Sequence, residues 1–166
     1  MRTLRDLLIV EAQDLHSGET LLWDSLRRIA ESARNQRLGA LLAAQRLETQ
    51  AQIGRLEAVL ARLGGAPSDD DCEAMEGIIA QAEELMEDDL PGEIMDAALA
   101  VTAIKVKHFE IASYRALLAL AEACGESEPA RLLRESLAEE WRAVAELDAI
   151  AAQDIHLRAA QLAPAG

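Results

Sequence analysis

Four long stretches of this chain repeat apolar residues at intervals of three and four, a spacing that predicts four long α-helices. One glutamate interrupts each apolar stripe, and the four are Glu19, Glu48, Glu110 and Glu140. The first two are 29 residues apart and the last two are 30 residues apart, so the two halves of the chain match. A carboxylate on the buried face of a helix is costly unless another group offsets its charge. The four glutamates are therefore the first candidates for a functional site.

Four long helices and one short helix are expected, separated by residues that cap or end helices. The long helices are predicted at residues 4–32, 36–63, 93–123 and 128–160, and the short one between 68 and 88. Thr3, Asn35 and Ser127 are suited to be N-caps, and Ser68 is suited to open the short helix. The connections within each half are short and the middle one is long, which predicts two antiparallel hairpins joined by a crossover. The sequence therefore predicts an all-α, ferritin-like four-helix bundle, a single domain over residues 1–163 with a frayed tail.

Composition narrows the classes of partner. The net charge of −14 argues against nucleic acid and against an anionic membrane surface. Two cysteines do not make a disulfide framework, and no apolar stretch reaches membrane-spanning length. The N-terminus has no signal-peptide profile, so a cytoplasmic location is expected.

Four carboxylates, one from each long helix, are the arrangement with which helical bundles hold two metal ions. Iron and manganese favour carboxylate and imidazole ligands. The usual pattern adds a histidine three residues after two of the glutamates, but Ala51 and Ala143 stand at those positions after Glu48 and Glu140. The residues alone therefore leave metal binding open.

Several segments resemble the YciE/YciF family of bacterial ferritin-like, stress-associated proteins, and the resemblance covers nearly the whole chain. The segments are RDLLIVEAQDLHSGETLL at 5–22, RLETQAQI at 46–53, CEAMEGIIAQAEEL at 72–85, DAALAVTAIKVKHFEIASY at 96–114 and LLRESLAEEW at 132–141. The resemblance implies a helical bundle, often a homodimer, with a buried di-metal centre. By position, Glu19, Glu48, Glu110 and Glu140 match the family's carboxylates.

Three positions depart from the family pattern, and each departure removes a ligand or an acceptor. Gln45 stands where a histidine is usual, Lys107 where a glutamate is usual, and Val144 where an aspartate is usual. Lys107 precedes Glu110 by three residues, so its ammonium can lie beside the site and replace the charge of a metal ion. The resulting hypothesis is a site with one metal ion or none. The alternative is that Lys107 points out of the bundle.

Four further residues are candidates for supporting the site. His108 is expected on an apolar face, either as a hydrogen-bonded core residue or as a partner of a ligand carboxylate. His16 shares a face with Glu19 and is a candidate ligand. Tyr114 can donate to a buried carboxylate or simply pack, and Gln52 is a neutral donor on the face of Glu48.

The leading functional hypothesis is a stress-associated protein that binds iron or manganese and consumes oxygen or peroxide or oxidises ferrous ion. The alternative is a metal-free bundle that acts as a structural or partner-binding dimer in stress response. An enzyme for a small organic substrate has no support beyond the fold. Whether the chain is an enzyme is left open.

Overall fold

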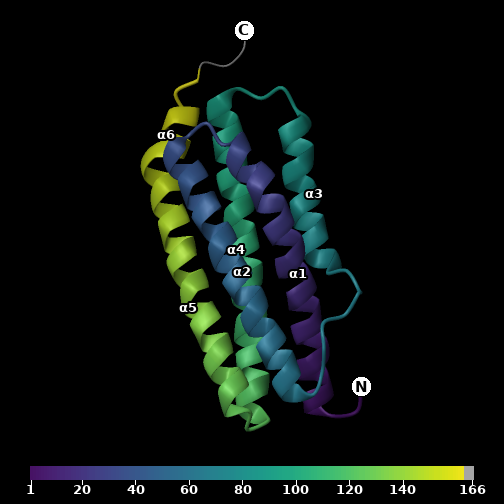
Figure 1. Ribbon diagram of the computed structural model, residues 1–166. Coiled ribbons are helices and arrows are strands. Elements are labelled where there is room, and N and C mark those ends of the chain that lie inside the picture. Colours follow the sequence, from purple (N-terminus) through teal and green to yellow (C-terminus); the bar gives the residue numbers. More distant parts are fainter. Residues whose placement is uncertain (163–166) are drawn as a thin grey trace.

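The computed structural model describes residues 1–162 as a bundle of long helices (Figure 1). Its elements are α1 (Leu4–Ser32), α2 (Gln36–Leu63), α3 (Glu73–Glu87), α4 (Gly92–Ala123), α5 (Ser127–Ile150), a π-helix (Ala151–Ile155) and α6 (His156–Ala159). Helices α1 and α2 form one antiparallel hairpin and α4 and α5 form the other, while α3 lies outside the four-helix core against α1 and α4. The predicted all-α, ferritin-like bundle with a short crossover helix is confirmed.

Side chains at the predicted positions cap the first hairpin. Thr3 accepts from the backbone N–H of Asp6 while the Asp6 carboxylate accepts from the backbone of Thr3, a reciprocal capping box. Asn35 accepts from the second and third N–H groups of α2. Gly64 ends α2 in the left-handed region, with φ of 80°, where a residue with a Cβ would be strained.

Two predicted helix starts were wrong. Ser127 is the first residue of α5 and not its cap, because the cap position falls on Glu126, which makes no side-chain bond there. Ser68 does not open α3, since its hydroxyl bonds Asp70 within the connection and the helix begins only at Glu73. Local side-chain bonds of serine compete with helix formation in this way.

The predicted last helix is interrupted by a π-helix at residues Ala151–Ile155. A π-turn inserts an extra residue into an α-helix and changes the direction of the side chains that follow. It places Asp154 beside Asn35 at the start of α2. The prediction of a frayed tail at residues 163–166 falls outside the described residues.

The core consists of two apolar clusters with a polar layer between them. One cluster contains Leu22, Leu26, Leu42, Leu99 and Leu147, and the other contains Leu15, Leu56, Leu117, Leu133 and their neighbours. Along α1, α4 and α5 the glutamates of the sequence pattern fall between these clusters. The fold therefore holds charged side chains at mid-height of its interior.

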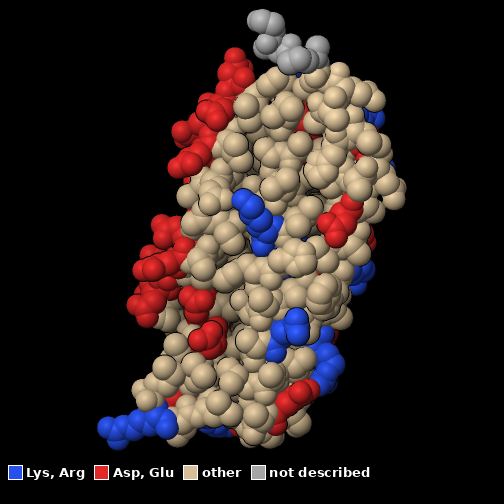
Figure 2. Space-filling view, turned by 180° about the vertical axis from the view of Figure 1, so that it is seen from behind, with Lys and Arg blue, Asp and Glu red and all other residues tan. Residues whose placement is uncertain are grey.

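The outside of the bundle is strongly acidic along one edge. Figure 2 shows acidic side chains gathered along the edge that α3 forms, and exposed ones there include Glu73, Glu76, Glu84, Glu87 and Asp88. Among residues 1–162 no helix is long and apolar enough to cross a bilayer.

Candidate functional site

Three of the four predicted glutamates meet in the polar layer, together with Lys107. Glu19, Glu110 and Glu140 are at most 1% exposed, and Lys107 is 2% exposed. The ammonium of Lys107 lies 2.7 Å from Glu110 Oε2 and 2.8 Å from Glu140 Oε2. Lys107 therefore points into the bundle, and the alternative that it points outward is wrong. We call Glu19, Lys107, Glu110 and Glu140 the Lys107 cluster.

Two neutral side chains donate hydrogen bonds to the Lys107 cluster. Tyr114 lies one turn beyond Glu110, and its hydroxyl donates to Glu19 Oε1 at 2.7 Å. Gln52 of α2 donates through Nε2 to Glu140 Oε1 at 2.6 Å. Both residues are completely buried. Gln52 was predicted as a donor, and for Tyr114 the alternative that it donates to a buried carboxylate is the one observed.

A second polar contact connects the Lys107 cluster to the surface. Gln52 Nε2 also donates to Glu139 Oε2 at 3.0 Å, and Arg55 clamps Glu139 with two bonds of 2.6 and 2.7 Å. The paired fork of a guanidinium on a carboxylate fixes the carboxylate in one orientation. The position of Gln52, and through it of Glu140, is therefore set from the rim of the bundle.

Burial and neighbouring charges determine the protonation of the glutamates. Burial is the main cause that raises the pKa of Glu19 to about 7, with the charge of Glu140 adding to it and Lys107 opposing it. Burial likewise raises the pKa of Glu110 well above its usual value, although Lys107 opposes it. Glu110 therefore keeps its proton to higher pH than a free glutamic acid.

Lys107 stays charged in spite of its burial. Burial alone would lower the pKa of its ammonium, but the carboxylates of Glu110, Glu140 and Glu19 more than offset that effect and raise it above its usual value. An amine surrounded by carboxylates at 2.7 and 2.8 Å is a permanent internal cation. It lies between the carboxylates of Glu110 and Glu140.

Glu48, the fourth predicted glutamate, is not part of the Lys107 cluster. Its side chain is 36% exposed and accepts a 2.7 Å bond from Arg142 of α5. Thr49 takes the inward position instead, between the buried Gln45 and Gln52. Each helical residue turns by about 100°, so Glu48 is rotated toward α5 when Gln45, Thr49 and Gln52 face the centre.

The two candidate histidines also lie away from the Lys107 cluster. His108 is exposed, so the prediction that it lies in the core or bonds a ligand carboxylate was wrong. It follows Lys107, and one step along the helix turns a side chain by about 100°. The Nε2 of His16 lies 3.6 Å from Glu57 of α2, an ion pair at the rim of the bundle if the imidazole is protonated.

Several residues of the site were missed by sequence reasoning. Thr49, Glu139 and Arg55 were not predicted, nor was Ser136, whose hydroxyl accepts from Arg55 at 3.0 Å. Arg55 follows Gln52 by three residues and so shares its face. Lys107 was predicted, and the composition gives a further reason to single it out, because the chain contains only two lysines, Lys105 and Lys107. An arginine-rich chain that places one of two lysines in an apolar stripe marks that position as special.

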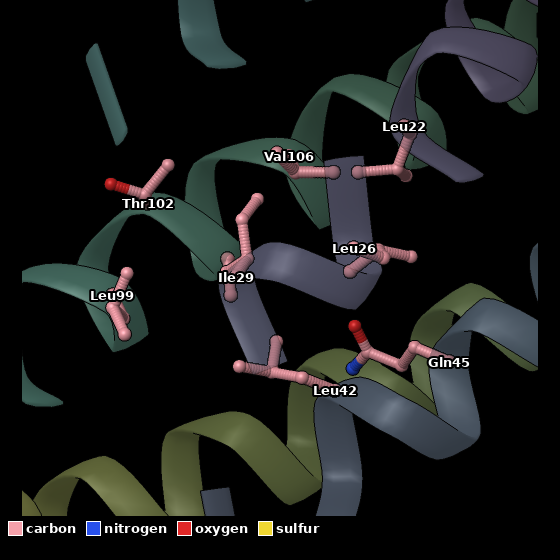
Figure 3. A pocket seen from close by; sticks show the side chains of 9 residues that line it. Leu22, Leu26, Ile29, Leu42, Gln45, Leu99, Thr102 and Val106 are labelled. Carbon is pink, nitrogen blue, oxygen red and sulfur yellow. The ribbon is translucent and has the colours of Figure 1, made fainter. Parts of the chain in front are cut away.

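A small cavity lies within the apolar cluster that contains Leu22, Leu42 and Leu99. Its volume is about 20 Å³, and it is lined by Leu22, Leu26, Ile29, Leu42, Gln45, Leu99, Thr102, Ala103 and Val106. Figure 3 shows the amide of Gln45 facing this apolar space. Gln45 is 3% exposed and contributes an amide where the resemblance implies a histidine.

The residues of the Lys107 cluster do not fit a two-metal centre. Two ions in a bundle need four carboxylates with imidazoles beside them, whereas here three carboxylates surround an ammonium. Val144, where an aspartate is usual, supplies no oxygen, and Glu48 is turned away. In the described part of the chain, no group of three or more His, Cys, Asp or Glu side chains is placed to hold a metal ion.

Comparisons with known proteins agree with the resemblance seen in the sequence. Residues 3–160 match the model of a domain of unknown function, DUF892. The protein YciF of Escherichia coli K12 is 36% identical over 160 residues, which cover 96% of each chain.

Solved structures share the fold over nearly the whole chain. The crystal structure of the E. coli stress protein YciF has a TM-score of 0.90 at 36% identity and covers 94% of this chain and 99% of its own. YcfI from Rhodopseudomonas palustris has a TM-score of 0.85 at 35% identity, with 89% and 94% covered. A Xanthomonas campestris protein, at 22% identity and a TM-score of 0.76 over 96% of this chain and 100% of its own, shares the fold. The chain therefore belongs to the YciF family of ferritin-like helical bundles, the family of the DUF892 domain.

Proposed function

We propose that this protein is a cytoplasmic structural bundle of the stress response, in which Lys107 replaces the metal ions of a ferritin-like centre. The observation that carries the proposal is the position of the Lys107 ammonium, in ion-pair contact with both Glu110 and Glu140. Two relatives support the direction of the proposal. E. coli YciF is described as a stress protein, and R. palustris YcfI is described as a candidate structural protein.

The charge balance favours the ammonium as the resident cation. Three carboxylates in one buried layer repel one another, and that repulsion is relieved by protons, by metal ions or by an internal cation. Lys107 supplies one positive charge at no cost in binding entropy, and the raised pKa of Glu110 supplies a proton. The ammonium and this proton together offset two of the three negative charges, and the raised pKa of Glu19 favours a second proton. A cluster balanced in this way holds the bundle together without a cofactor.

A second candidate is a site for one iron or manganese ion, with oxidative chemistry supplied by the ion when it is bound. It is favoured by Glu19 Oε2 and Glu110 Oε1, two buried oxygens without a hydrogen-bond partner or an ion-pair partner among residues 1–162. Glu19, Glu110 and Glu140 would hold the ion. Lys107 would first have to leave its two carboxylates.

The experiment that separates the candidates measures metal content and thermal stability together. The wild-type protein, Lys107→Glu and Lys105→Glu are purified without chelator and loaded anaerobically with ferrous or manganous ion. A metal that binds only the folded protein raises the unfolding temperature, because binding shifts the equilibrium toward that state. Lys105 is exposed, so its variant changes the net charge equally without entering the cluster.

We expect the wild-type protein to bind no metal and to show no change in its unfolding temperature. In Lys107→Glu, we expect added metal to raise the unfolding temperature. If Lys107→Glu unfolds without metal, recovery of helical circular dichroism on adding ferrous ion gives the same answer. One ion per wild-type chain would establish the second candidate. Two ions per wild-type chain would overturn the proposal that Lys107 substitutes for metal.

We also propose that the protein is a homodimer formed through the outward face of α2. Exposed small or apolar residues recur there at intervals of four and three, namely Ala40, Ala44, Leu47, Ala51, Gly54 and Ala58. This is the spacing of helices that pack along a seam, and Leu47 is 68% exposed in the single chain.

We expect Leu47→Glu to halve the molar mass of the protein measured by light scattering. Leu157→Glu, a control at another exposed leucine, should leave that mass unchanged. Equal masses for wild type and Leu47→Glu would refute this interface.

A further inference from the structure

Three arginines gather around a hollow at the end of the bundle where α2 and α4 begin. The hollow has a volume of about 370 Å³ and is lined by Arg34, Asn35, Gln36, Arg37, Asp154 and Arg158. Arg34 belongs to the connection between α1 and α2, Arg37 to the first turn of α2, and Arg158 to α6. Three segments thus bring guanidinium groups together on a chain whose net charge is −14.

The acids near this hollow already have partners. Asp96 is 7% exposed, and its two oxygens accept the backbone N–H groups of Arg34 and Asn35 at 2.8 and 3.0 Å. Asp154 accepts from Asn35 Nδ2 at 2.8 Å and from Arg158 Nε. These bonds fix the connection that carries Arg34, and they occupy both oxygens of each carboxylate. The two negative charges remain beside the three arginines and offset part of their positive charge.

Arg34 and Arg37 keep their hydrogen-bonding capacity. Within residues 1–162 neither guanidinium has a carboxylate partner within 4.0 Å. Arg158 is paired through Nε alone, which leaves its two terminal nitrogens as donors. Guanidinium groups donate in a planar fork that matches the oxygens of a phosphate group.

The backbone adds a weaker attraction of the same sign. The 28-residue helix α2 begins at Gln36 beside the hollow, and the 32-residue helix α4 begins at Gly92 without a side-chain cap. Helix starts carry partial positive charge and favour anions. An adjoining hollow of about 190 Å³ contains Gly92 but also Glu93, so an anion is expected on the side of Arg37.

Gly92 determines where the side chain of Arg34 lies. A Cβ added at Gly92 would fall 2.9 Å from Arg34 Nε and closer still to its Cδ, so the side chain of Arg34 would have to move. An alanine at this position therefore tests the placement of Arg34 without changing any charge. The absence of a side chain at the start of α4 is what lets the guanidinium lie there.

We propose that this arginine hollow is a binding site for the phosphate group of a small molecule, either inorganic phosphate or a phosphate ester. Three guanidinium groups and the start of α2 suit a compact dianion. A polyanion such as nucleic acid would also meet the acidic surface of the remaining chain, which repels it.

The test is isothermal titration calorimetry of the full-length protein with inorganic phosphate and, separately, with glycerol phosphate, at constant ionic strength. The variants are Arg34→Gln with Arg37→Gln, Gly92→Ala, and Arg62→Gln as a charge control at the other end of α2. Loss of charge-assisted hydrogen bonds is expected to weaken binding about tenfold or more in the double variant. Gly92→Ala should weaken it by a smaller factor, and Arg62→Gln should stay within about twofold.

Saturable binding with this order of affinities supports the site, and tighter binding of glycerol phosphate than of inorganic phosphate identifies an ester as the ligand. No saturable heat with either anion overturns the proposal. Equal weakening by Arg62→Gln overturns it as well, because binding would then follow net charge alone. Circular dichroism of each variant confirms that a loss of binding is not a loss of folding.

Discussion

Lys107 is the residue on which the interior of this bundle depends. It is the cation shared by Glu110 and Glu140, and it lies where neither water nor salt screens its charge. A buried ion pair is weak evidence for net stability, but removing one partner leaves an uncompensated charge. The ion pairs of Lys107 therefore add little net stability, but removing Lys107 would leave buried carboxylates without a compensating charge.

We expect Lys107→Met to lower the free energy of unfolding by about 3–5 kcal/mol at pH 8. The loss should shrink at pH 5, because protonation then neutralises the abandoned carboxylates. Urea denaturation at the two pH values measures both quantities. Lys105→Met, at the exposed second lysine, should change stability by no more than about 0.5 kcal/mol. Equal effects of the two variants would contradict the role given to Lys107.

The pH dependence of stability follows from the raised pKa of Glu19. Its pKa is about 7 in the folded protein against 4.5 ordinarily, so between these values the folded chain binds a proton that the unfolded chain has released. The stability that this proton provides is complete below pH 4.5 and is lost as the pH rises toward 7. The slope for one proton is about 1.4 kcal/mol per pH unit.

Glu19→Gln should reduce the slope of the free energy of unfolding against pH by the contribution of one proton, because a glutamine does not titrate. Tyr114 can still donate to its amide oxygen, so the variant keeps the hydrogen bond of the native side chain. Urea denaturation from pH 4.5 to pH 8 measures the slope in both proteins. An unchanged slope in Glu19→Gln would show that Glu19 does not carry the titration.

The sequence predicts that four glutamates share a buried layer of the bundle, and three of them do, whereas Glu48 lies outside it for a geometric reason. Their role as metal ligands stays a prediction. The stripe around Glu48 was drawn with correct spacing, but Glu48 and Thr49 are one residue apart and either could face inward. Which one does so depends on how α2 packs against the other helices, and at the outer position Glu48 pairs with Arg142 of α5. A stripe on one helix carries no information about such a partner.

At the scale of elements, the connection between α1 and α2 is held by Asp96 of α4. Its carboxylate accepts two backbone N–H groups of the three-residue linker, residues 33–35, at a hairpin end. The sequence predicts Asn35, in this linker, as the N-cap of α2 but does not predict the role of Asp96, which is distant in the chain. Helix ends follow from local residues, whereas the clamp on them follows from the packing of α4 against the hairpin.

We expect Asp96→Ala to lower the free energy of unfolding by about 2–3 kcal/mol, because two charge-assisted hydrogen bonds are lost. Hydrogen exchange at the amides of Arg34 and Asn35 should accelerate more than exchange in the middle of α2. Asp148→Ala, at an exposed position of α5, is the control and should be near neutral. Uniform acceleration along α2 would mean that Asp96 stabilises the whole fold and not this linker.

At the scale of the whole molecule, the excess of negative charge opposes the compact state. The net charge is −14, and acidic side chains gather along the edge formed by α3 (Figure 2). Salt screens such repulsion over about 10 Å at an ionic strength of 0.1 M. Salt also weakens the surface ion pairs, but the stability lost in this way is small because each exposed pair contributes little.

We therefore expect the unfolding temperature to rise by a few degrees between about 0.01 M and 0.3 M sodium chloride. Thermal denaturation followed by circular dichroism measures it. Potassium chloride should give the same rise, since the effect is screening and not specific binding. A fall in the unfolding temperature would show that ion pairs such as that of Arg55 with Glu139 outweigh the repulsion.

Tyr114 gives the protein a built-in optical reporter of its own interior. It is the only tyrosine in the chain, and its hydroxyl is bonded to Glu19. Burial, with the charge of Glu19 adding to it, raises the pKa of this phenol well above its usual value. Absorbance of tyrosinate in alkaline solution should consequently appear only when the bundle opens. One unmodified side chain thus reports spectroscopically, without any label, when the layer that contains Lys107 first meets water.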